Sequence, residues 1–269
     1  MDAESTAQII SMAVGGFVDT HDEYRKVVTS SSPLKRPVDI RTSTWRPWLT
    51  EGGRAGSSSY VGPIDPERAA IADRLLADLP GLDREHHGSG ADRRMDRAQL
   101  VTLAEAAAKR GKQHERRCIA LWVASMMWGA GTVNGRGPWR TAHGLASENL
   151  GAVLVESHRA IRAGELDEAY VAASAIAGSG EAAFTRWLWA AALDTRLPLQ
   201  PLVLDGPGRN GFETALDDTA ATRSRLGTGR VAYAWFVESL NLTAAELRTR
   251  PGFKGTTPEK VAWLLSEQW

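Results

Sequence analysis

From Asp65 onward, apolar side chains recur with the spacing of amphipathic helices, and no alternating pattern typical of a strand appears. Asp65 followed by Pro66 predicts a helix start, because Asp accepts hydrogen bonds from first-turn amides and Pro fits the first helical position. We expect this helix to stop at Pro80 and Gly81. The same signals predict helices over about 96–110, 113–128, 147–163, 165–176, 181–193, 209–216, 229–240 and 257–268. The fold class is therefore all-α.

The predicted helix at 113–128 is apolar on nearly every side, which is typical of a central, buried helix. Gly129, Ala130 and Gly131 follow it. We expect them to end the helix and to open a loop that extends to Thr141.

Residues 1–60 have a different composition, with Ser-, Gly- and Pro-rich stretches around short apolar pieces. We expect an irregular N-terminal segment that packs on the body through Trp45 and Trp48. The predicted organisation is therefore this segment at 1–60 and a helical domain at 61–269.

The formal net charge is zero, which is weak support for a nucleic-acid binder. Residues 106–140 nevertheless hold seven Lys and Arg against Glu115 alone: Lys109, Arg110, Lys112, Arg116, Arg117, Arg136 and Arg140. This local excess either neutralises DNA phosphates or forms an ordinary solvated helix face.

The lone Cys118 excludes an internal disulfide. The first residues have no basic stretch typical of a signal peptide, and no apolar run approaches the roughly 20 residues of a membrane span. We therefore expect a cytoplasmic protein without membrane contact. The histidines have no metal-ligand spacing and no phosphate-binding glycine motif occurs, so we expect neither a metal nor a cofactor.

Gly178 and Gly180 lie between two predicted helices. Such a turn can present backbone amides at a helix N-terminus, where partial positive charge favours a phosphate. A simple turn between two helices is the alternative.

Asp205 follows the apolar run Pro201–Leu204 and precedes Gly206. A carboxylate in this position can stabilise an oxocarbenium-like sugar and orient water during cleavage of an N-glycosidic bond. It can also cap the helix that follows, and the two roles are compatible.

Three stretches carry a resemblance to a bacterial family with the 8-oxoguanine DNA glycosylase fold. The first joins Trp128-Gly129-Ala130-Gly131 to Asn134-Gly135-Arg136-Gly137-Pro138-Trp139-Arg140-Thr141, the second begins at Gly178 and ends at Leu188, and the third is Leu202 to Asp205. Tyr233 and the Thr257-Pro258-Glu259 helix start are similar to the family's C-terminal part. The resemblance covers roughly residues 95–269.

The resemblance implies an all-α helix-hairpin-helix glycosylase, with the hairpin at about 165–193 and DNA as the partner. In the related bifunctional enzymes a lysine after the hairpin attacks the sugar. Here the matching position is Arg186, in Phe184-Thr185-Arg186, and no lysine occurs between Lys112 and Lys254. Arginine stays protonated and cannot be that nucleophile. We therefore expect a monofunctional enzyme that uses Asp205 and water and leaves an abasic site.

Glycosylases flip the target nucleotide out of the duplex and read its base by stacking and hydrogen bonds. Gly178, Gly180, Arg186, Arg136 and Arg140 are the candidate DNA-binding residues. Trp128, Asn134 and Trp139 are the candidates for base recognition, although a structural role in the core is the alternative for each tryptophan.

The sequence thus predicts a DNA glycosylase acting on an oxidised purine or on a hypermodified phage base in antiviral defence. One alternative is a non-catalytic nucleic-acid-binding protein on the same fold, which the neutral charge and Arg186 favour. Another is a helical protein-interaction domain, although no protein partner is indicated.

Overall fold

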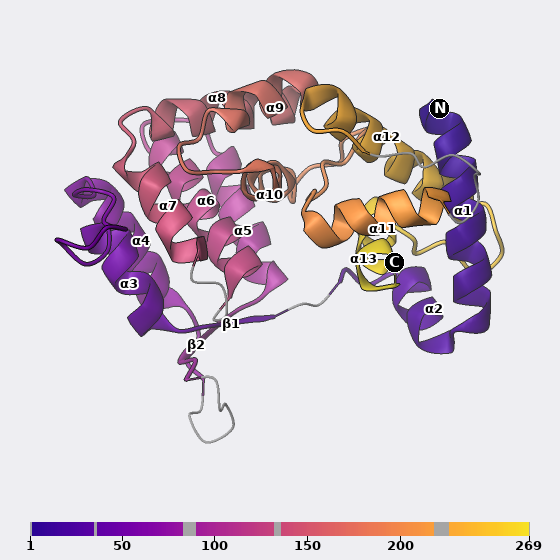
Figure 1. The fold of residues 1–269 in the computed structure, drawn as a ribbon, viewed down its shortest axis with the longest axis horizontal. Coiled ribbons are helices and arrows are strands. Elements are labelled where there is room, and N and C mark those ends of the chain that lie inside the picture. Colours follow the sequence, from indigo (N-terminus) through magenta and orange to yellow (C-terminus); the bar gives the residue numbers. More distant parts are fainter. Residues whose placement is uncertain (1, 35–36, 83–89, 132–135, 218–225, 269) are drawn as a thin grey trace. The chain divides into compact units, whose positions relative to one another are not determined.

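The computed structural model describes residues 2–34, 37–82, 90–131, 136–217 and 226–268. These ranges contain thirteen helices and one pair of short strands, which confirms the all-α class (Figure 1). The chain divides into two compact units. Unit 1 comprises residues 1–34 and 197–269, and unit 2 comprises residues 35–196. No described helix is both long enough and apolar enough to cross a membrane.

Unit 2 contains eight of the described helices. They are α3 (Thr42–Glu51), α4 (Pro66–Asp78), α5 (Arg97–Ala108), α6 (His114–Ala130), α7 (Arg136–Ala146), α8 (Leu150–Ala163), α9 (Leu166–Ser174) and α10 (Glu181–Ala191). The strands β1 (Val38–Ile40) and β2 (Arg93–Met95) are antiparallel, with Asp39 opposite Arg94.

Helix α6 forms the centre of unit 2. It packs against α4, α5, α7, α8 and α10, which surround it in Figure 1. Nine of its residues are buried, including Cys118, Trp122 and Met126. An apolar surface on all sides requires cover on all sides, so α6 organises this unit as the sequence predicted.

Side-chain caps begin α4 and α5 where the sequence predicted helix starts. The Asp65 side chain accepts a hydrogen bond from the Arg68 amide, 3.0 Å away, and Pro66 follows it. At α5 the pairing is reciprocal: Asp96 accepts from the Gln99 amide at 3.0 Å, and Gln99 accepts from the Asp96 amide at 2.7 Å. The N-cap amide of Asp96 and the first-turn amide of Gln99 are thereby satisfied.

Unit 1 consists of helices from the two ends of the chain. They are α1 (Ala3–Thr20), α2 (Asp22–Thr29), α11 (Gly206–Asp217), α12 (Arg230–Leu247) and α13 (Pro258–Gln268). Helix α1 packs along α12, and α11 packs along α13. Lys260 of α13 is 1% exposed, and its Nζ donates to the backbone carbonyls of Ser30 and Gly255. A buried ammonium is stabilised only by such partners, so Lys260 ties the end of α2 to α13.

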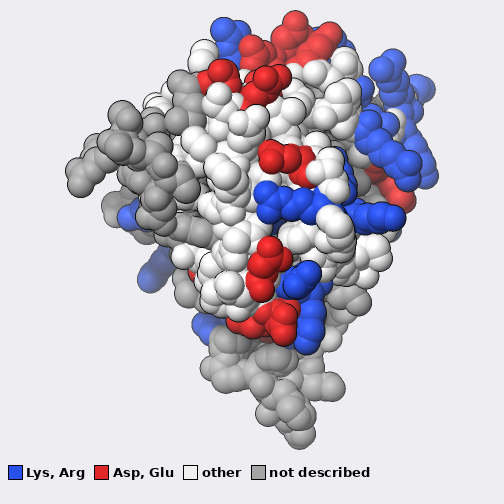
Figure 2. Space-filling model, turned by 90° about the vertical axis from the view of Figure 1, so that its right-hand side faces the viewer, with Lys and Arg blue, Asp and Glu red and all other residues white. Residues whose placement is uncertain are grey.

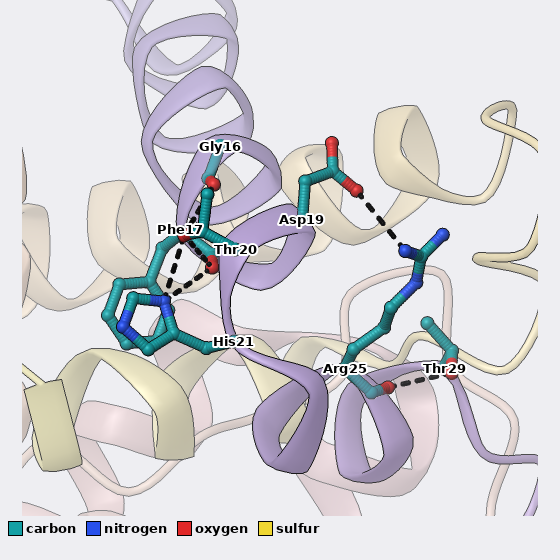
Figure 3. Close-up of polar contacts among 7 residues, drawn as sticks. All are labelled: Gly16, Phe17, Asp19, Thr20, His21, Arg25 and Thr29. Carbon is teal, nitrogen blue, oxygen red and sulfur yellow. Dashed lines mark hydrogen bonds and ion pairs between the residues drawn. The ribbon is translucent and has the colours of Figure 1, made fainter.

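His21 separates α1 from α2 (Figure 3). Its ring stacks on Phe17 at 4.0 Å between ring centres, and its Nδ1 lies 2.9 Å from the Phe17 carbonyl oxygen. Thr20 Oγ1 also donates to that carbonyl at 2.9 Å. These contacts satisfy backbone groups that the end of α1 would otherwise leave unpaired.

The N-terminal segment that we expected to be irregular is largely helical, since α1, α2 and α3 occupy most of residues 3–51. Ile10, Val14 and Val18 recur every four residues along α1 and are fully buried. The Ser- and Gly-rich compositions lie in the connections between helices. The expected boundary near residue 60 also differs from the observed division, because residues 1–34 pack with the C-terminal helices.

The glycine-rich stretch 129–141 is also more helical than expected. Gly129 and Ala130 belong to α6, and residues 136–141 begin α7. The reason is close packing between helices. A Cβ at Gly137 would lie 2.3 Å from the Ala130 Cβ, and a Cβ at Gly144 would lie 2.3 Å from the Trp122 ring. These glycines allow two helices to approach each other.

The charged side chains are mixed on the face drawn in Figure 2. Lys and Arg lie beside Asp and Glu there, and no continuous basic surface forms among the residues drawn in colour. This agrees with the formal net charge of zero.

The reciprocal cap at α5 leads to a stability prediction. Asp96→Ala removes the carboxylate that accepts from the Gln99 amide, although the residue-96 amide can still donate to Gln99, and it should lower the free energy of unfolding by about 1 kcal/mol. Asp78→Ala is the control, because its exposed ion pair with Arg74 (3.6 Å) should contribute less than about 0.5 kcal/mol. Urea unfolding of both variants checks this, and equal losses would contradict the assigned cap.

Candidate functional site

The Gly178–Gly180 turn joins α9 to α10, as the sequence predicted. Ile176 accepts a hydrogen bond from the Ser179 amide at 3.1 Å, which closes the turn. Gly180 is the N-cap of α10 and provides no side-chain acceptor to the first-turn amides. The turn is therefore a helix hairpin that ends at a helix N-terminus, as anion binding by backbone amides requires.

The two glycines of the turn differ in how strongly the structure requires glycine at their positions. Gly178 has φ +71°, and a Cβ there would lie 2.5 Å from the His143 Cβ of α7. Gly180 has φ −79°, and a Cβ there would have no neighbour within 4 Å. Gly178 is thus required by the fold, whereas Gly180 leaves open space in front of α10.

Tyr170 of α9 braces the hairpin. Its hydroxyl donates to Glu181 Oε1 at 2.6 Å, and its ring meets the Phe184 ring edge-on at 4.9 Å. Glu181 is the first residue of α10, where a carboxylate is favoured by the helix dipole. The brace holds that carboxylate against α9.

Arg186 lies half-buried on α10, against the last turn of α6. A Cβ at Gly129 would lie 2.0 Å from Arg186 Nε, so the Arg186 side chain lies against the Gly129 backbone, although Gly129 itself is exposed. The C-terminus of a helix carries partial negative charge, which favours a cation at this place. Arg186 therefore has a structural role in addition to any contact with DNA.

The tryptophans of α6 and α10 form a stack. Trp128 and Trp189 are 4.7 Å apart with a 25° angle between their planes, and Arg97 lies 5.4 Å from the Trp189 ring centre. Trp189 is buried, so one face of the half-buried Trp128 ring is already occupied. Trp187 points elsewhere and donates to Ser157 Oγ of α8 at 2.8 Å.

Helix α7 carries the remaining candidates of unit 2. Arg136 is its exposed first residue, and Trp139 and Arg140 are half-buried. Trp139 meets His143 edge-on at 4.4 Å, and His143 adjoins Gly178, so this face of α7 lies beside the hairpin. Asn134 lies outside the described residues.

Part of the basic excess at 106–140 is used in structural contacts. Arg116 pairs with Glu67 at 2.7 Å, and Arg117 donates to the Lys109 carbonyl at 2.8 Å. Lys109, Arg110 and Lys112 are exposed around the connection between α5 and α6.

Asp205 belongs to unit 1 and caps α11. Its Oδ1 accepts from the Gly208 amide at 3.0 Å, and its carbonyl accepts from the Arg209 amide at 2.9 Å. A Cβ at Gly208 would lie 3.2 Å from Oδ1, so glycine allows this close approach. The side chain is half-buried, and Oδ2 has no hydrogen-bond partner among the described residues.

Two side chains of α12 hold the segment that leads to Asp205. The fully buried Tyr233 donates to the Leu202 carbonyl at 2.9 Å. Asn241 accepts from the Gln200 amide at 3.0 Å and donates to the Gln200 carbonyl at 3.1 Å. The backbone of an irregular segment is thereby satisfied, and the carboxylate is placed by buried contacts.

Sequence reasoning missed a cluster on α6 and α8. Single ligand atoms of His114, Cys118 and His158 all lie within 4.8 Å of one another. Burial raises the pKa of the Cys118 thiol to about 12 and lowers the pKa of His158 to about 4. Four-residue spacing of His114 and Cys118 places both on one helix face, and this was the signal available in the sequence.

Comparison with known proteins gives one family. The family model described as "Putative 8-oxoguanine DNA glycosylase OGG-like protein" matches residues 31–265. The match includes the hairpin, Arg186 and Asp205. No curated protein and no solved structure matches the chain.

The contrast between the hairpin glycines leads to a second prediction. Gly178→Ala combines positive φ with a clash against α7, and it should lower the free energy of unfolding by more than about 1 kcal/mol. Gly180→Ala meets neither obstacle and is the matched control. Urea unfolding of the two variants tests this, and a stable Gly178→Ala would contradict the described turn.

Proposed function

Because the chain belongs to the 8-oxoguanine DNA glycosylase OGG-like family, we propose that it hydrolyses the N-glycosidic bond of a damaged or modified DNA base. The family match over residues 31–265 carries this proposal. The lone Cys118 and a DNA substrate favour a cytoplasmic location.

Asp205 is the proposed catalytic carboxylate. Its Oδ1 is engaged in capping α11, whereas Oδ2 has no described hydrogen-bond partner, which supports a role for Oδ2 toward water. In the reaction the bond between sugar and base breaks, positive charge develops on the sugar, and water adds at the same carbon. A fixed carboxylate stabilises that charge and accepts the proton of the attacking water.

The hairpin and its neighbours in unit 2 are the proposed DNA contacts. Gly180 leaves the start of α10 open, and the Gly178 turn lies beside Arg140 of α7. We assign backbone contacts to Gly178, Gly180, Arg186, Arg136 and Arg140, and base recognition by flipping to Trp128, Asn134 and Trp139. Since one face of Trp128 is already stacked on Trp189, a base would use its other face.

We propose that the enzyme is monofunctional. Arg186 stands where the related bifunctional enzymes use a lysine, and its side chain lies against the Gly129 backbone. It keeps its proton at neutral pH and cannot form a Schiff base. The product is then an intact abasic site.

The substrate is proposed to be an oxidised purine or a hypermodified base of phage DNA. Incubation of the purified protein with DNAs that carry oxidised, alkylated and phage-type bases, followed by mass spectrometry of free bases, identifies which base is released.

The third prediction concerns Asp205→Asn. Asn keeps the oxygen that accepts from the Gly208 amide, so the cap and the folded structure should persist. Loss of the negative charge should lower the rate of base release about 100-fold or more. The measurement is single-turnover base release. Asp19→Asn, which changes an exposed carboxylate of the same unit, is the control and should release base at the wild-type rate.

Wild-type release rates in the folded Asp205→Asn variant would contradict the role of Asp205. Binding of DNA without release of any base from the panel would contradict the glycosylase and favour the non-catalytic DNA reader. Failure to bind DNA even at low salt would favour a protein-interaction domain, because phosphate contacts alone give measurable affinity.

The fourth prediction separates the two glycosylase chemistries. Borohydride reduction during turnover should trap no covalent protein–DNA adduct, because no lysine replaces Arg186. Alkali should cleave the product at the abasic site. A trapped adduct on gel electrophoresis would overturn the monofunctional assignment while leaving base release itself in place.

A further inference from the structure

The cluster formed by His114, Cys118 and His158 has the composition and geometry of a metal site. We propose that these three side chains bind a zinc ion that links α6 to α8. The inference is independent of the glycosylase proposal, because none of the three residues is assigned to DNA binding or to base release.

The spacing of the donor atoms fits a tetrahedral ion. His114 Nε2 and His158 Nδ1 are 3.3 Å apart. Zinc–nitrogen bonds of about 2.0–2.1 Å at tetrahedral angles place two imidazole nitrogens about 3.3–3.4 Å apart. Cys118 offers its sulfur within 4.8 Å of both ligand atoms, one helical turn after His114.

The far side of the His158 ring supplies an independent observation. His158 is 3% exposed, and its Nε2 has no hydrogen-bond partner among the described residues. Asp194 acts electrostatically on His158, and its Oδ1 is likewise buried and unpartnered, while Oδ2 accepts from Arg162 at 2.5 Å. Histidine ligands commonly donate their second nitrogen to a carboxylate, directly or through water. We propose that the buried His158 Nε2 and Asp194 Oδ1 form such a pair when the metal binds.

The donor set selects the metal. One thiolate and two imidazoles suit zinc, which prefers sulfur and nitrogen donors in tetrahedral geometry, and they do not suit Mg²⁺ or Ca²⁺. When zinc binds, the Cys118 thiol releases its proton to solvent and a zinc–sulfur bond forms. The Cys118 thiolate supplies one negative charge to the ion, whereas the Asp194 carboxylate is shared with Arg162. With three protein ligands, the fourth position of a tetrahedral zinc ion would be taken by water.

Cobalt substitution tests the proposal, because Co²⁺ adopts the same geometry as zinc and is coloured. The full-length protein is first stripped with a chelator and then titrated with Co²⁺. We expect one equivalent to give a near-ultraviolet band of thiolate-to-cobalt charge transfer, which zinc then displaces. Since Cys118 is the sole cysteine of the chain, any such band reports this site.

Variants identify the ligands. Cys118→Ala should abolish the charge-transfer band, and His114→Gln should weaken zinc binding at least about 10-fold, measured by competition with a chromophoric chelator. His21→Gln changes a histidine outside the cluster and is the control. It should leave the charge-transfer band and the zinc affinity unchanged. Zinc should also raise the midpoint of thermal unfolding of the wild type.

Absence of the band in the folded wild-type protein would overturn the proposal, and this outcome does not depend on whether a variant folds. Zinc affinity that is unchanged in His114→Gln would also overturn it. Base release reports on the glycosylase and cobalt or zinc binding reports on the metal site. A negative result in one experiment therefore leaves the other proposal standing.

Discussion

The burial of α6 is the constraint on which unit 2 depends. A helix that is apolar on all sides must be covered on all sides, and α4, α5, α7, α8 and α10 supply that cover. The same packing places the side chains available for chemistry. Arg186 of α10 comes to lie against Gly129, Trp189 stacks on Trp128, and His158 of α8 meets His114 and Cys118. Gly129, Gly137 and Gly144 have no side chains, and this allows the neighbouring side chains and helices to come this close.

In unit 1, the Asp205 carboxylate lies at the end of a segment without helix or strand structure. Leu202–Asp205 receives no stabilisation from a helix or sheet of its own. Tyr233 and Asn241 of α12 provide it instead, through hydrogen bonds to the Leu202 and Gln200 backbones. Asp205 then uses one oxygen to begin α11 and keeps the other available. Because a carboxylate has two acceptor oxygens, the capping role of Asp205 is compatible with the catalytic role that we propose for it.

Charge explains why composition alone is a poor guide to the DNA contacts of this chain. The basic excess at 106–140 is real, but Arg116 is paired with Glu67 and Arg117 donates to the Lys109 carbonyl. The DNA contact that we propose for the hairpin uses backbone amides and the helix dipole rather than lysines, which is compatible with zero net charge.

The sequence by itself determined the helices of residues 65–131 and 147–268 well, because caps such as Asp65 and Asp96 and the apolar pattern of α6 are local signals. It also predicted the hairpin and the capping of α11 by Asp205, and the resemblance named the family that the comparison confirmed. It failed at α1, α2 and α3, because the Ser- and Gly-rich connections between them suggested an irregular segment, and at α7, whose glycines serve close helix packing. Only the tertiary structure decided that Gly178 is required and Gly180 is not, that Arg186 lies against the end of α6, and that His158 joins His114 and Cys118. These relations connect residues tens of positions apart, and no local pattern encodes which helix faces another.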